Sequence, residues 1–280
     1  MRIPVTTLND GYDFPLLGLG TYKLTGDEVE PIVRTAIELG YRHIDTAALY
    51  DNEVEVGKAI NAAIKAGDVT REELFVTTKL WNDDQERVAE AYHESLKRLD
   101  LEFIDLYLVH WPWPQHGTYV KAFEQIAELQ GMGRLQSAGV ANFYPEVLDE
   151  IIAATGITPV LNQVELHAGF TQPELRAYHD EHDIVTEAWA PLARGGNFDD
   201  PAIQAVADKH GATPAQVSLA YLMQLGCSVV PKTANPKRLE ENLGAVGITL
   251  DSEDVAALDG VAGERLSGCL LYTSDAADEE

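Results

Sequence analysis

Short apolar runs and longer amphipathic stretches alternate along almost the whole chain. The apolar runs are rich in β-branched residues, as buried strands are, and the stretches between them follow the period of a helix. Eight strands are expected at residues 16–19, 43–46, 74–78, 104–109, 135–140, 160–164, 185–188 and 228–231. Eight helices are expected at residues 28–39, 53–66, 86–99, 119–132, 145–154, 173–181, 214–225 and 236–246. This alternation indicates βα units around a parallel sheet.

The predicted helices carry clear boundary signals. Several begin with Pro in the first turn, and several end at a Gly. The closing glycines are Gly40, Gly67, Gly133 and Gly226. Eight strands and eight helices predict a closed (β/α)8 TIM barrel of the α/β class. A doubly wound sheet is the alternative, but the turn from Gly18 to Thr21 lacks the third Gly of the GxGxxG dinucleotide fingerprint.

Three segments extend the minimal barrel. Residues 201–210 and 252–261 predict two extra helices. Two short apolar segments flank Asn9-Asp10-Gly11, which is a hairpin turn signal, so we expect an N-terminal β-hairpin that caps the bottom of the barrel. No internal repeat or linker interrupts the pattern. The sequence therefore predicts a single barrel domain over residues 1–268.

The charge balance excludes some partners. The 280 residues include 46 acidic and 20 basic side chains, which gives a net charge of −26. Nucleic acids and anionic membranes repel such a chain, because they are bound through Lys and Arg. The acidic residues are spread along the helices, as in proteins of a salt-rich, halophilic cytoplasm, where salt screens their mutual repulsion. An ordinary soluble acidic protein is the alternative.

Cysteine content and the N-terminus indicate the compartment. The two cysteines, Cys227 and Cys269, are too few for a disulfide framework and lack metal-ligand spacing. The N-terminus carries no apolar signal segment, and no run approaches the ~20 apolar residues of a transmembrane helix. We therefore expect a cytoplasmic protein that binds no membrane.

Polar residues follow the ends of three consecutive predicted strands: Asp45, Tyr50, Lys79 and His110. Singly, each has an ordinary structural explanation, such as a loop cap, a surface ion pair, a half-buried ring or a core histidine. Together they favour chemistry, because the strand ends of a parallel barrel share one cavity and a Lys there needs a partner such as Asp45. An ammonium beside a phenol lowers the pKa of Tyr50, which can then give and take a proton near neutral pH. This arrangement predicts a site for carbonyl reduction.

Longer motifs extend this pattern along the chain. They comprise residues 15–22 (PLLGLGTY), 40–47 (GYRHIDTA), 78–82 (TKLWN), 105–112 (DLYLVHWP), 162–163 (NQ), 231–233 (PKT) and 238–242 (RLEEN). In order and spacing, from residue 3 to about 268, they resemble the aldo-keto reductases, and most closely the prokaryotic branch that includes the 2,5-diketo-gluconate reductases. The resemblance implies a nicotinamide-dependent reductase of aldehydes and ketones that needs no metal. Tyr50 would protonate the developing alkoxide, Lys79 and Asp45 would tune the pKa of Tyr50, and His110 would orient the carbonyl by hydrogen bonding.

The resemblance also implies a set of contacts with NADP(H). Gly20, Thr21, Asp45, Asn142 and Gln163 would surround the nicotinamide and its ribose, and the ring of Trp189 would stack under the nicotinamide. The pyrophosphate loop would include Leu192, Arg194 and Gly195. The 2′-phosphate would be held by Lys232, Thr233 and Arg238, and the adenine by Glu241 and Asn242.

The basic residues of this set have a physical explanation. Lys232, Lys237 and Arg238 lie around the predicted start of the helix at residues 236–246. A solvated helix start is the plain alternative. However, basic residues oppose the helix dipole at that end unless an anion is bound there, so a bound phosphate explains the cluster better and favours NADP(H) over NAD(H).

Aromatic residues near the strand ends predict the substrate pocket. The resemblance implies a lining of Tyr22, Leu49, Trp81, Trp111 and Trp113, which admits aliphatic and aromatic aldehydes, dicarbonyls and keto-sugars. The expected partner is a small-molecule carbonyl substrate, and the expected state is a monomer. A metal-dependent barrel hydrolase lacks support, because no His-x-His pair or acidic cluster stands at the strand ends. An NADP(H)-binding sensor without turnover is a further alternative, against which the proton donor Tyr50 argues.

The sequence departs from the family pattern at three places. Ala141 stands where Ser is usual, which removes one hydrogen bond to the cofactor, worth about 0.5–1.5 kcal/mol. Asp51 stands where Gly is commoner and adds a negative charge beside Tyr50. Residues 269–280 replace an Asp-Pro-containing segment and resemble translated adapter sequence, so we expect an artefactual tail that is not part of the fold.

Overall fold

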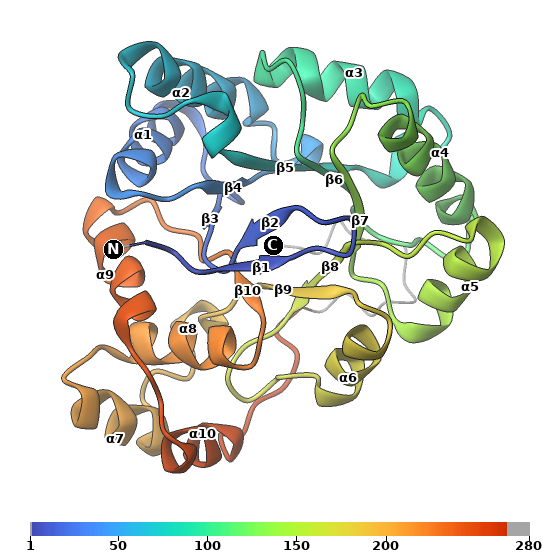
Figure 1. Cartoon of the computed structure of the whole chain (residues 1–280). Coiled ribbons are helices and arrows are strands. Elements are labelled where there is room, and N and C mark those ends of the chain that lie inside the picture. Colours follow the sequence, from blue (N-terminus) through green and yellow to red (C-terminus); the bar gives the residue numbers. More distant parts are fainter. Residues whose placement is uncertain (1, 268–280) are drawn as a thin grey trace.

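A closed barrel of parallel strands forms the centre of the molecule (Figure 1). This computed structural model describes residues 2–267; residues 269–280, expected to be a tail, lie outside the described residues. Within that range the sheet has eight strands in the order β10-β9-β8-β7-β6-β5-β4-β3, and each neighbouring pair is parallel. The strands are β3 (Leu19–Gly20), β4 (His43–Asp45), β5 (Phe75–Leu80), β6 (Leu106–Val109), β7 (Ser137–Ala141), β8 (Leu161–Glu165), β9 (Val185–Trp189) and β10 (Ser228–Val229).

Two parallel bridges close the barrel between its first and last strands. They pair Leu17 with Val229 and Gly20 with Lys232. The backbone N–H of Gly18 donates to the carbonyl of Val229 at 2.9 Å across the same seam. The expected (β/α)8 barrel is confirmed. Its first strand is shorter than the expected 16–19, because residues 16–18 meet β10 through single hydrogen bonds instead of a continuous ladder.

Helices surround the barrel (Figure 1). They are α1 (Val29–Leu39), α2 (Glu53–Ala66), α3 (Val88–Leu99), α4 (Tyr119–Gly131), α5 (Pro145–Thr155), α6 (Pro173–Glu181), α7 (Pro201–His210), α8 (Pro214–Gln224), α9 (Pro236–Gly244) and α10 (Ser252–Asp259). α7 and α10 are the two expected extra helices, and they pack against each other. Helices α1 and α2 end at Gly40 and Gly67, whose φ angles of +103° and +80° are left-handed and close the last turn.

The N-terminal hairpin covers one end of the barrel. β1 (Val5–Thr7) and β2 (Asp13–Pro15) pair antiparallel, and they cross the centre of the ring of strands in Figure 1. Phe14 is fully buried, with its ring 4.8 Å from the rings of both His43 and Phe75. Since His43 and Phe75 begin their strands, the hairpin closes the N-terminal end and leaves the carboxyl ends of the strands for a site.

The last described segment is tied to the barrel through Glu165. Its carboxylate accepts hydrogen bonds from the backbone N–H of Leu266 and from both the N–H (3.1 Å) and the hydroxyl (2.6 Å) of Ser267. Burial raises the pKa of Glu165, but hydrogen bonds from His167, Leu266 and Ser267 outweigh it and lower the pKa to about 2. Glu165 is therefore a carboxylate that anchors residues 266–267, the last described segment. Among the helices of residues 2–267, none is long and apolar enough to cross a membrane.

Candidate active site

Four polar side chains predicted from the sequence converge at the carboxyl end of the barrel. Asp45 is the last residue of β4, Lys79 lies near the end of β5, and His110 directly follows β6. Tyr50 ends a short 3-10 helix at Ala48–Tyr50 that begins just after β4. Parallel strands bring their carboxyl ends to one edge, which is why residues so far apart in sequence meet here.

A buried ion pair joins Lys79 to Asp45. The Lys79 side chain is 0% exposed, and its Nζ donates to the two carboxylate oxygens of Asp45 at 2.8 and 2.9 Å. The same ammonium donates to the carbonyl of Thr46 at 2.9 Å and to the hydroxyl oxygen of Tyr50 at 3.3 Å. A positive charge at this distance stabilises a phenolate electrostatically, so the geometry supports proton transfer at Tyr50.

Aromatic rings pack beside the ring of Tyr50 and beside His110. The ring of Tyr50 lies 5.1 Å from that of Tyr22 and 5.8 Å from that of His110, and the ring of Trp81 lies 5.3 Å from that of His110. Burial and then the charge of Lys79 hold the pKa of His110 well below its usual value. His110 is therefore a neutral imidazole that carries one N–H donor.

The other predicted pocket residues differ in their burial. Trp111 is buried, Trp113 is half-buried, and Leu49 is exposed. The φ angle of Trp113 is +48°, and its ring lies against that of His116, with centroids 3.5 Å apart and the two planes tilted by 32°. The indole N–H groups of Trp111 and Trp113 have no hydrogen-bond partner within the described residues.

Residues predicted to contact the nicotinamide end form one hydrogen-bonded network around the ion pair. The hydroxyl of Thr21 donates to the backbone carbonyl of Asp45 at 2.9 Å, and Gly20 pairs with Asp45 in the sheet register. The amide of Asn142 donates to the carbonyl of His110 at 3.0 Å and accepts from the indole N–H of Trp189 at 2.9 Å. Gln163 donates to Asp45 at 2.8 Å.

The predicted phosphate contacts lie on the following loops. Leu192 is half-buried, whereas Arg194 and Gly195 are exposed and left-handed, with φ angles of +53° and +82°. At the start of α9, Lys232, Lys237 and Arg238 are exposed, and none of them lies within 4.0 Å of a carboxylate oxygen in residues 2–267. Three cations near one helix start that pair with no carboxylate of residues 2–267, in a sequence with 46 acidic residues, fit a bound phosphate.

The remaining predicted residues support the start and body of α9. The hydroxyl of Thr233 accepts from the N–H of Asn235 at 3.0 Å, and the side chain of Asn235 caps the helix by accepting from the N–H of Lys237. Asn242 is buried, and Glu241 is half-buried. Glu241 and Asn242 thus lie on the same helix as the basic residues Lys237 and Arg238.

The two sequence departures inside the barrel have visible consequences. Asp51 follows the short helix with a φ of +52°, a left-handed conformation that favours Gly, which explains why Gly is commoner at this position. Ala141 ends β7 with its side chain buried. It places a methyl group where the family pattern has a hydroxyl.

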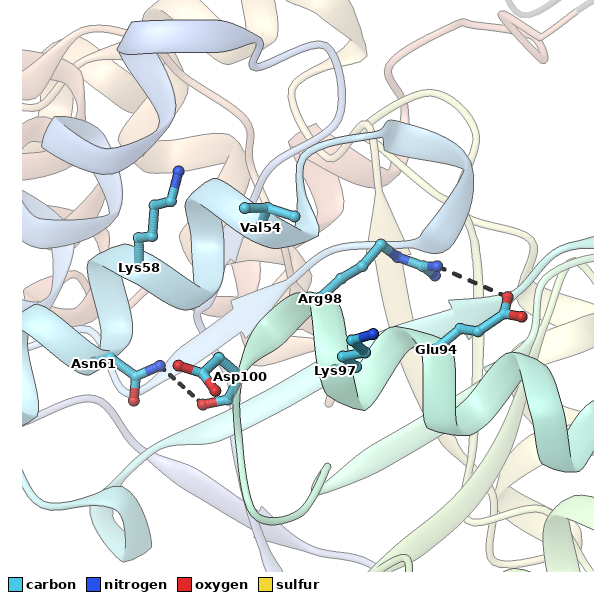
Figure 2. A pocket seen from close by; sticks show the side chains of 7 residues that line it. All are labelled: Val54, Lys58, Asn61, Glu94, Lys97, Arg98 and Asp100. Atoms are coloured by element: carbon cyan, nitrogen blue, oxygen red, sulfur yellow. Dashed lines mark hydrogen bonds and ion pairs between the residues drawn. The ribbon is translucent and has the colours of Figure 1, made fainter.

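A groove elsewhere on the molecule is not the site. A groove of about 680 Å³ lies on the outer helices α2 and α3, and Figure 2 shows the side chains that line it. It is lined by Val54, Lys58, Asn61, Glu94, Lys97, Arg98 and Asp100. None of these residues lies at a strand end, and the charges of Arg98 and Glu94 are paired with Glu53 at 2.6 Å and with Arg87 at 2.9 Å.

The structure adds two buried residues that the sequence analysis missed, His43 and Glu187. Glu187 lies in β9 and is 0% exposed, and its carboxyl accepts from the amide of Gln163 at 2.6 Å. His43 begins β4, with its Nδ1 3.5 Å from Glu187. The signal in the sequence is a Glu within a strand that is otherwise apolar at its inward positions.

The similarity of the whole chain to known proteins decides the family. The model of the "Aldo/keto reductase family" matches residues 16–262, which is most of the barrel. The chain belongs to the aldo/keto reductase family. The resemblance expected from the sequence motifs is therefore confirmed.

Relatives of this aldo/keto reductase match along nearly their full length. Methylglyoxal reductase DkgA of Salmonella typhimurium is 46% identical over 267 residues, which cover 94% of this chain and 95% of that protein. An aldo-keto reductase of Mycolicibacterium smegmatis is 43% identical over 266 residues, with 94% and 95% coverage.

Solved structures of aldo/keto reductases share the fold. The apo form of Gox0644 has a TM-score of 0.90 and 42% identity, and the match covers 98% of this chain and 99% of that one. A Gox0644 variant in complex with NADPH has a TM-score of 0.89 at 42% identity, with 96% and 97% coverage. A Bombyx mori aldo-keto reductase in complex with NADP has a TM-score of 0.86 at 38% identity, with 92% coverage of both chains.

Proposed function

We propose that this protein is an NADPH-dependent reductase of aldehydes and ketones, with Tyr50 as the proton donor. The observation that carries the proposal is the hydroxyl of Tyr50, 3.3 Å from an ammonium that is itself fixed on a buried carboxylate. Such a group holds and releases a proton at one defined atom. Family membership and the structures of relatives with NADPH or NADP support the cofactor.

The residues present fit NADP(H). Lys232, Lys237 and Arg238 are cations without a carboxylate partner in the described chain, as a 2′-phosphate site requires. Trp189 offers an aromatic face at the end of β9, next to the amide of Asn142. When bound, the nicotinamide supplies a hydride to the carbonyl carbon of the substrate.

Side chains of the protein donate the proton to the substrate oxygen and stabilise the charge that remains on Tyr50. Tyr50 gives its O–H proton to the oxygen that becomes the alcohol, and the ammonium of Lys79 stabilises the phenolate that remains. The carboxylate of Asp45 is the counter-charge of the buried Lys79 ammonium, at 2.8 Å. The single N–H of His110 orients the substrate carbonyl, because a neutral imidazole donates without competing as an acid.

Small dicarbonyl compounds fit the site best as substrates. The ring of Tyr22 lies beside Tyr50 and the ring of Trp81 beside His110, so aromatic side chains flank the two groups that would contact the substrate carbonyl. Relatives that are 46% identical carry the name methylglyoxal reductase. We therefore assign methylglyoxal and similar small dicarbonyls, with keto-sugars as further candidates.

The proposal is tested by NADPH oxidation with methylglyoxal, comparing the wild type with Tyr50→Phe. We expect turnover to fall by about 10²-fold or more in Tyr50→Phe, since the proton donor is removed. NADPH binding, followed by quenching of tryptophan fluorescence, should persist in both proteins. Equal turnover in the two proteins contradicts the role of Tyr50. NADPH binding without turnover on any carbonyl identifies a sensor instead.

The surface charge supports a monomer that works in a salt-rich cytoplasm. A net charge of −26 opposes self-association, and molar salt screens it within a few Å. The expected result is a melting temperature that rises between low salt and molar KCl, with one monomeric peak in size-exclusion chromatography. An unchanged melting temperature contradicts the adaptation to salt.

A further inference from the structure

The interior of the barrel holds more negative than positive groups. Asp45 and Glu187 are two carboxyl groups behind the site, and Lys79 is the one cation that faces them within residues 2–267. All three side chains are at most 4% exposed. Because an unpaired charge in a dry interior costs several kcal/mol, one of the two carboxyl groups has to be neutral.

The hydrogen bonds show which carboxyl group is ionised. Lys79 places its ammonium on both oxygens of Asp45, at 2.8 and 2.9 Å. Glu187 instead accepts from a neutral donor, the amide of Gln163, at 2.6 Å, and its other oxygen lies 3.2 Å from the hydroxyl of Ser228, whose hydrogen is shared with the carbonyl of Pro15 at 2.9 Å. Asp45 is therefore the anion, and Glu187 has no ammonium to hold it ionised.

A neighbouring histidine completes the arrangement. The Nδ1 of His43 lies 3.5 Å from Glu187 and has no other partner in the described chain, while its Nε2 lies 3.1 Å from the hydroxyl of Thr77. Burial and then Lys79 lower the pKa of His43 to about 3. Burial and then Asp45 raise the pKa of Glu187. At neutral pH the proton between these two groups belongs to Glu187.

Gln163 connects this acid to the ion pair. Its amide nitrogen carries two hydrogens, and it donates one to Asp45 at 2.8 Å and one to Glu187 at 2.6 Å. The planar amide then turns its oxygen away from both carboxyl groups. Gln163 thus keeps one orientation as long as both acceptors remain in place.

We propose that Glu187 is a positioning residue which, as an uncharged carboxylic acid, fixes the amide of Gln163 and sets the charge behind Tyr50. The role rests on the proposed function, in which Gln163 contacts the nicotinamide and Tyr50 donates the proton. Ionisation of Glu187 adds a second negative charge to the interior. This charge raises the proton affinity of the Lys79 and Tyr50 pair and keeps Tyr50 protonated at alkaline pH.

The groups that face Glu187 come from four other strands of the barrel, of which only β8 and β10 are neighbours of β9. β4 contributes the titratable His43 and Asp45, and β5 contributes Lys79. β8 and β10 contribute the neutral Gln163 and Ser228. Since His43 stays neutral and Lys79 stays on Asp45, Glu187 is the group of this set whose charge changes as the pH rises from 7 to 10.

Infrared difference spectroscopy tests the protonation directly, without turnover. At pH 7, the wild-type spectrum minus that of Glu187→Gln should show the C=O stretch of a protonated carboxyl group, and the band should disappear toward pH 10. Glu165→Gln is the matched control, because Glu165 is a buried carboxylate on the neighbouring strand and is ionised at pH 7. The proposal is overturned if Glu187 gives no protonated-carboxyl band. It is also overturned if the protein holds one equivalent of a tightly bound metal on His43, Asp45 and Glu187.

The effect on Tyr50 is measured by NMR of protein labelled with 13C-tyrosine, with Tyr50→Phe to assign the signal. We expect the titration midpoint of Tyr50 to be about one pH unit lower in Glu187→Gln than in the wild type, because the variant never gains the interior charge. Identical midpoints overturn the coupling. This measurement needs no substrate, so it decides the role of Glu187 even if the wild type reduces no carbonyl and the proposed function fails.

Kinetics separate positioning from mere folding. Glu187→Gln keeps an acceptor for Gln163 and should match the wild-type kcat at pH 6–7, then fall about 10-fold below it at pH 9.5. Glu187→Ala loses the acceptor and should be slower at every pH. If the kcat of Glu187→Gln is the same fraction of the wild-type kcat at every pH, the role of Glu187 is only structural and the proposal is overturned.

Discussion

Replacing Lys79 with Met separates the contribution of the buried ion pair to folding from its contribution to proton donation. The Lys79 and Asp45 side chains are 0% and 4% exposed and are joined by two short hydrogen bonds. In Lys79→Met the carboxylate of Asp45 stays buried without a counter-charge. Breaking such a pair from one side costs about 3–5 kcal/mol of stability.

The double variant Asp45→Asn/Lys79→Met removes both charges. The amide introduced by Asp45→Asn still offers an oxygen to the Gln163 donor, which lies 2.8 Å from the carboxylate of Asp45 in the wild type. We therefore expect the double variant to recover stability to within about 1–2 kcal/mol of the wild type. Turnover should stay at least about 10²-fold below wild type in both variants, since Tyr50 has lost its ammonium.

Urea unfolding measures the stability of each variant, and NADPH oxidation on the same preparations measures its turnover. The expected pattern is an unstable and inactive single variant beside a stable and inactive double variant. Asp45→Asn alone completes the cycle, and destabilisation of the double variant by the sum of the effects of Lys79→Met and Asp45→Asn refutes the coupling between the charges. Wild-type turnover in Lys79→Met refutes the role of the ammonium in proton donation.

Three further predictions test other parts of the molecule. The pKa of Glu165 is about 2 in the folded protein against an ordinary 4.5, so its ionised form contributes about 3 kcal/mol to the free energy of unfolding above pH 4.5. This contribution is lost as the pH falls from 4.5 toward 2. Glu165→Gln should therefore flatten the dependence of stability on pH in that range, as measured by urea unfolding. Gly57→Ala should cost about 3 kcal/mol or more in urea unfolding, because its Cβ would lie 2.1 Å from the carbonyl oxygen of Leu99, whereas Gly131→Ala in α4 meets nothing and should stabilise by about 0.5 kcal/mol. Lys232→Ala with Arg238→Ala should raise the KM for NADPH about 10-fold or more and leave that for NADH nearly unchanged; equal effects on both cofactors would contradict a 2′-phosphate site.

Local sequence signals predicted most of the fold. Helix ends were predictable because left-handed glycines such as Gly40 and Gly67 close the last turn, and α2 and α6 have the predicted bounds. The convergence of Asp45, Lys79 and His110 was predictable because parallel strands share one carboxyl edge. The first strand was not predicted correctly, since its pairing with β10 depends on how the barrel closes over a distance of about 200 residues.

The interior network behind the site required the three-dimensional structure. In the sequence, Glu187 is one acidic residue in an apolar strand. No local pattern indicates that the pairing of β8, β9 and β10 places Gln163, Glu187 and Ser228 side by side. Its approach to His43 depends on contact across the barrel between strands that are not neighbours. The length of chain between the partners, more than 140 residues, explains why pattern analysis missed the pair.

The central claim, that hydride moves from NADPH to a carbonyl carbon in this site, is tested most directly by isotope transfer. The wild type is incubated with methylglyoxal and NADPH in which both hydrogens at C4 are deuterium, and the alcohol product is analysed by mass spectrometry and NMR. The account predicts one deuterium on the new carbinol carbon and none on its oxygen after exchange in water. An alcohol product without carbon-bound deuterium, or NADPH that is bound but never oxidised, would contradict it.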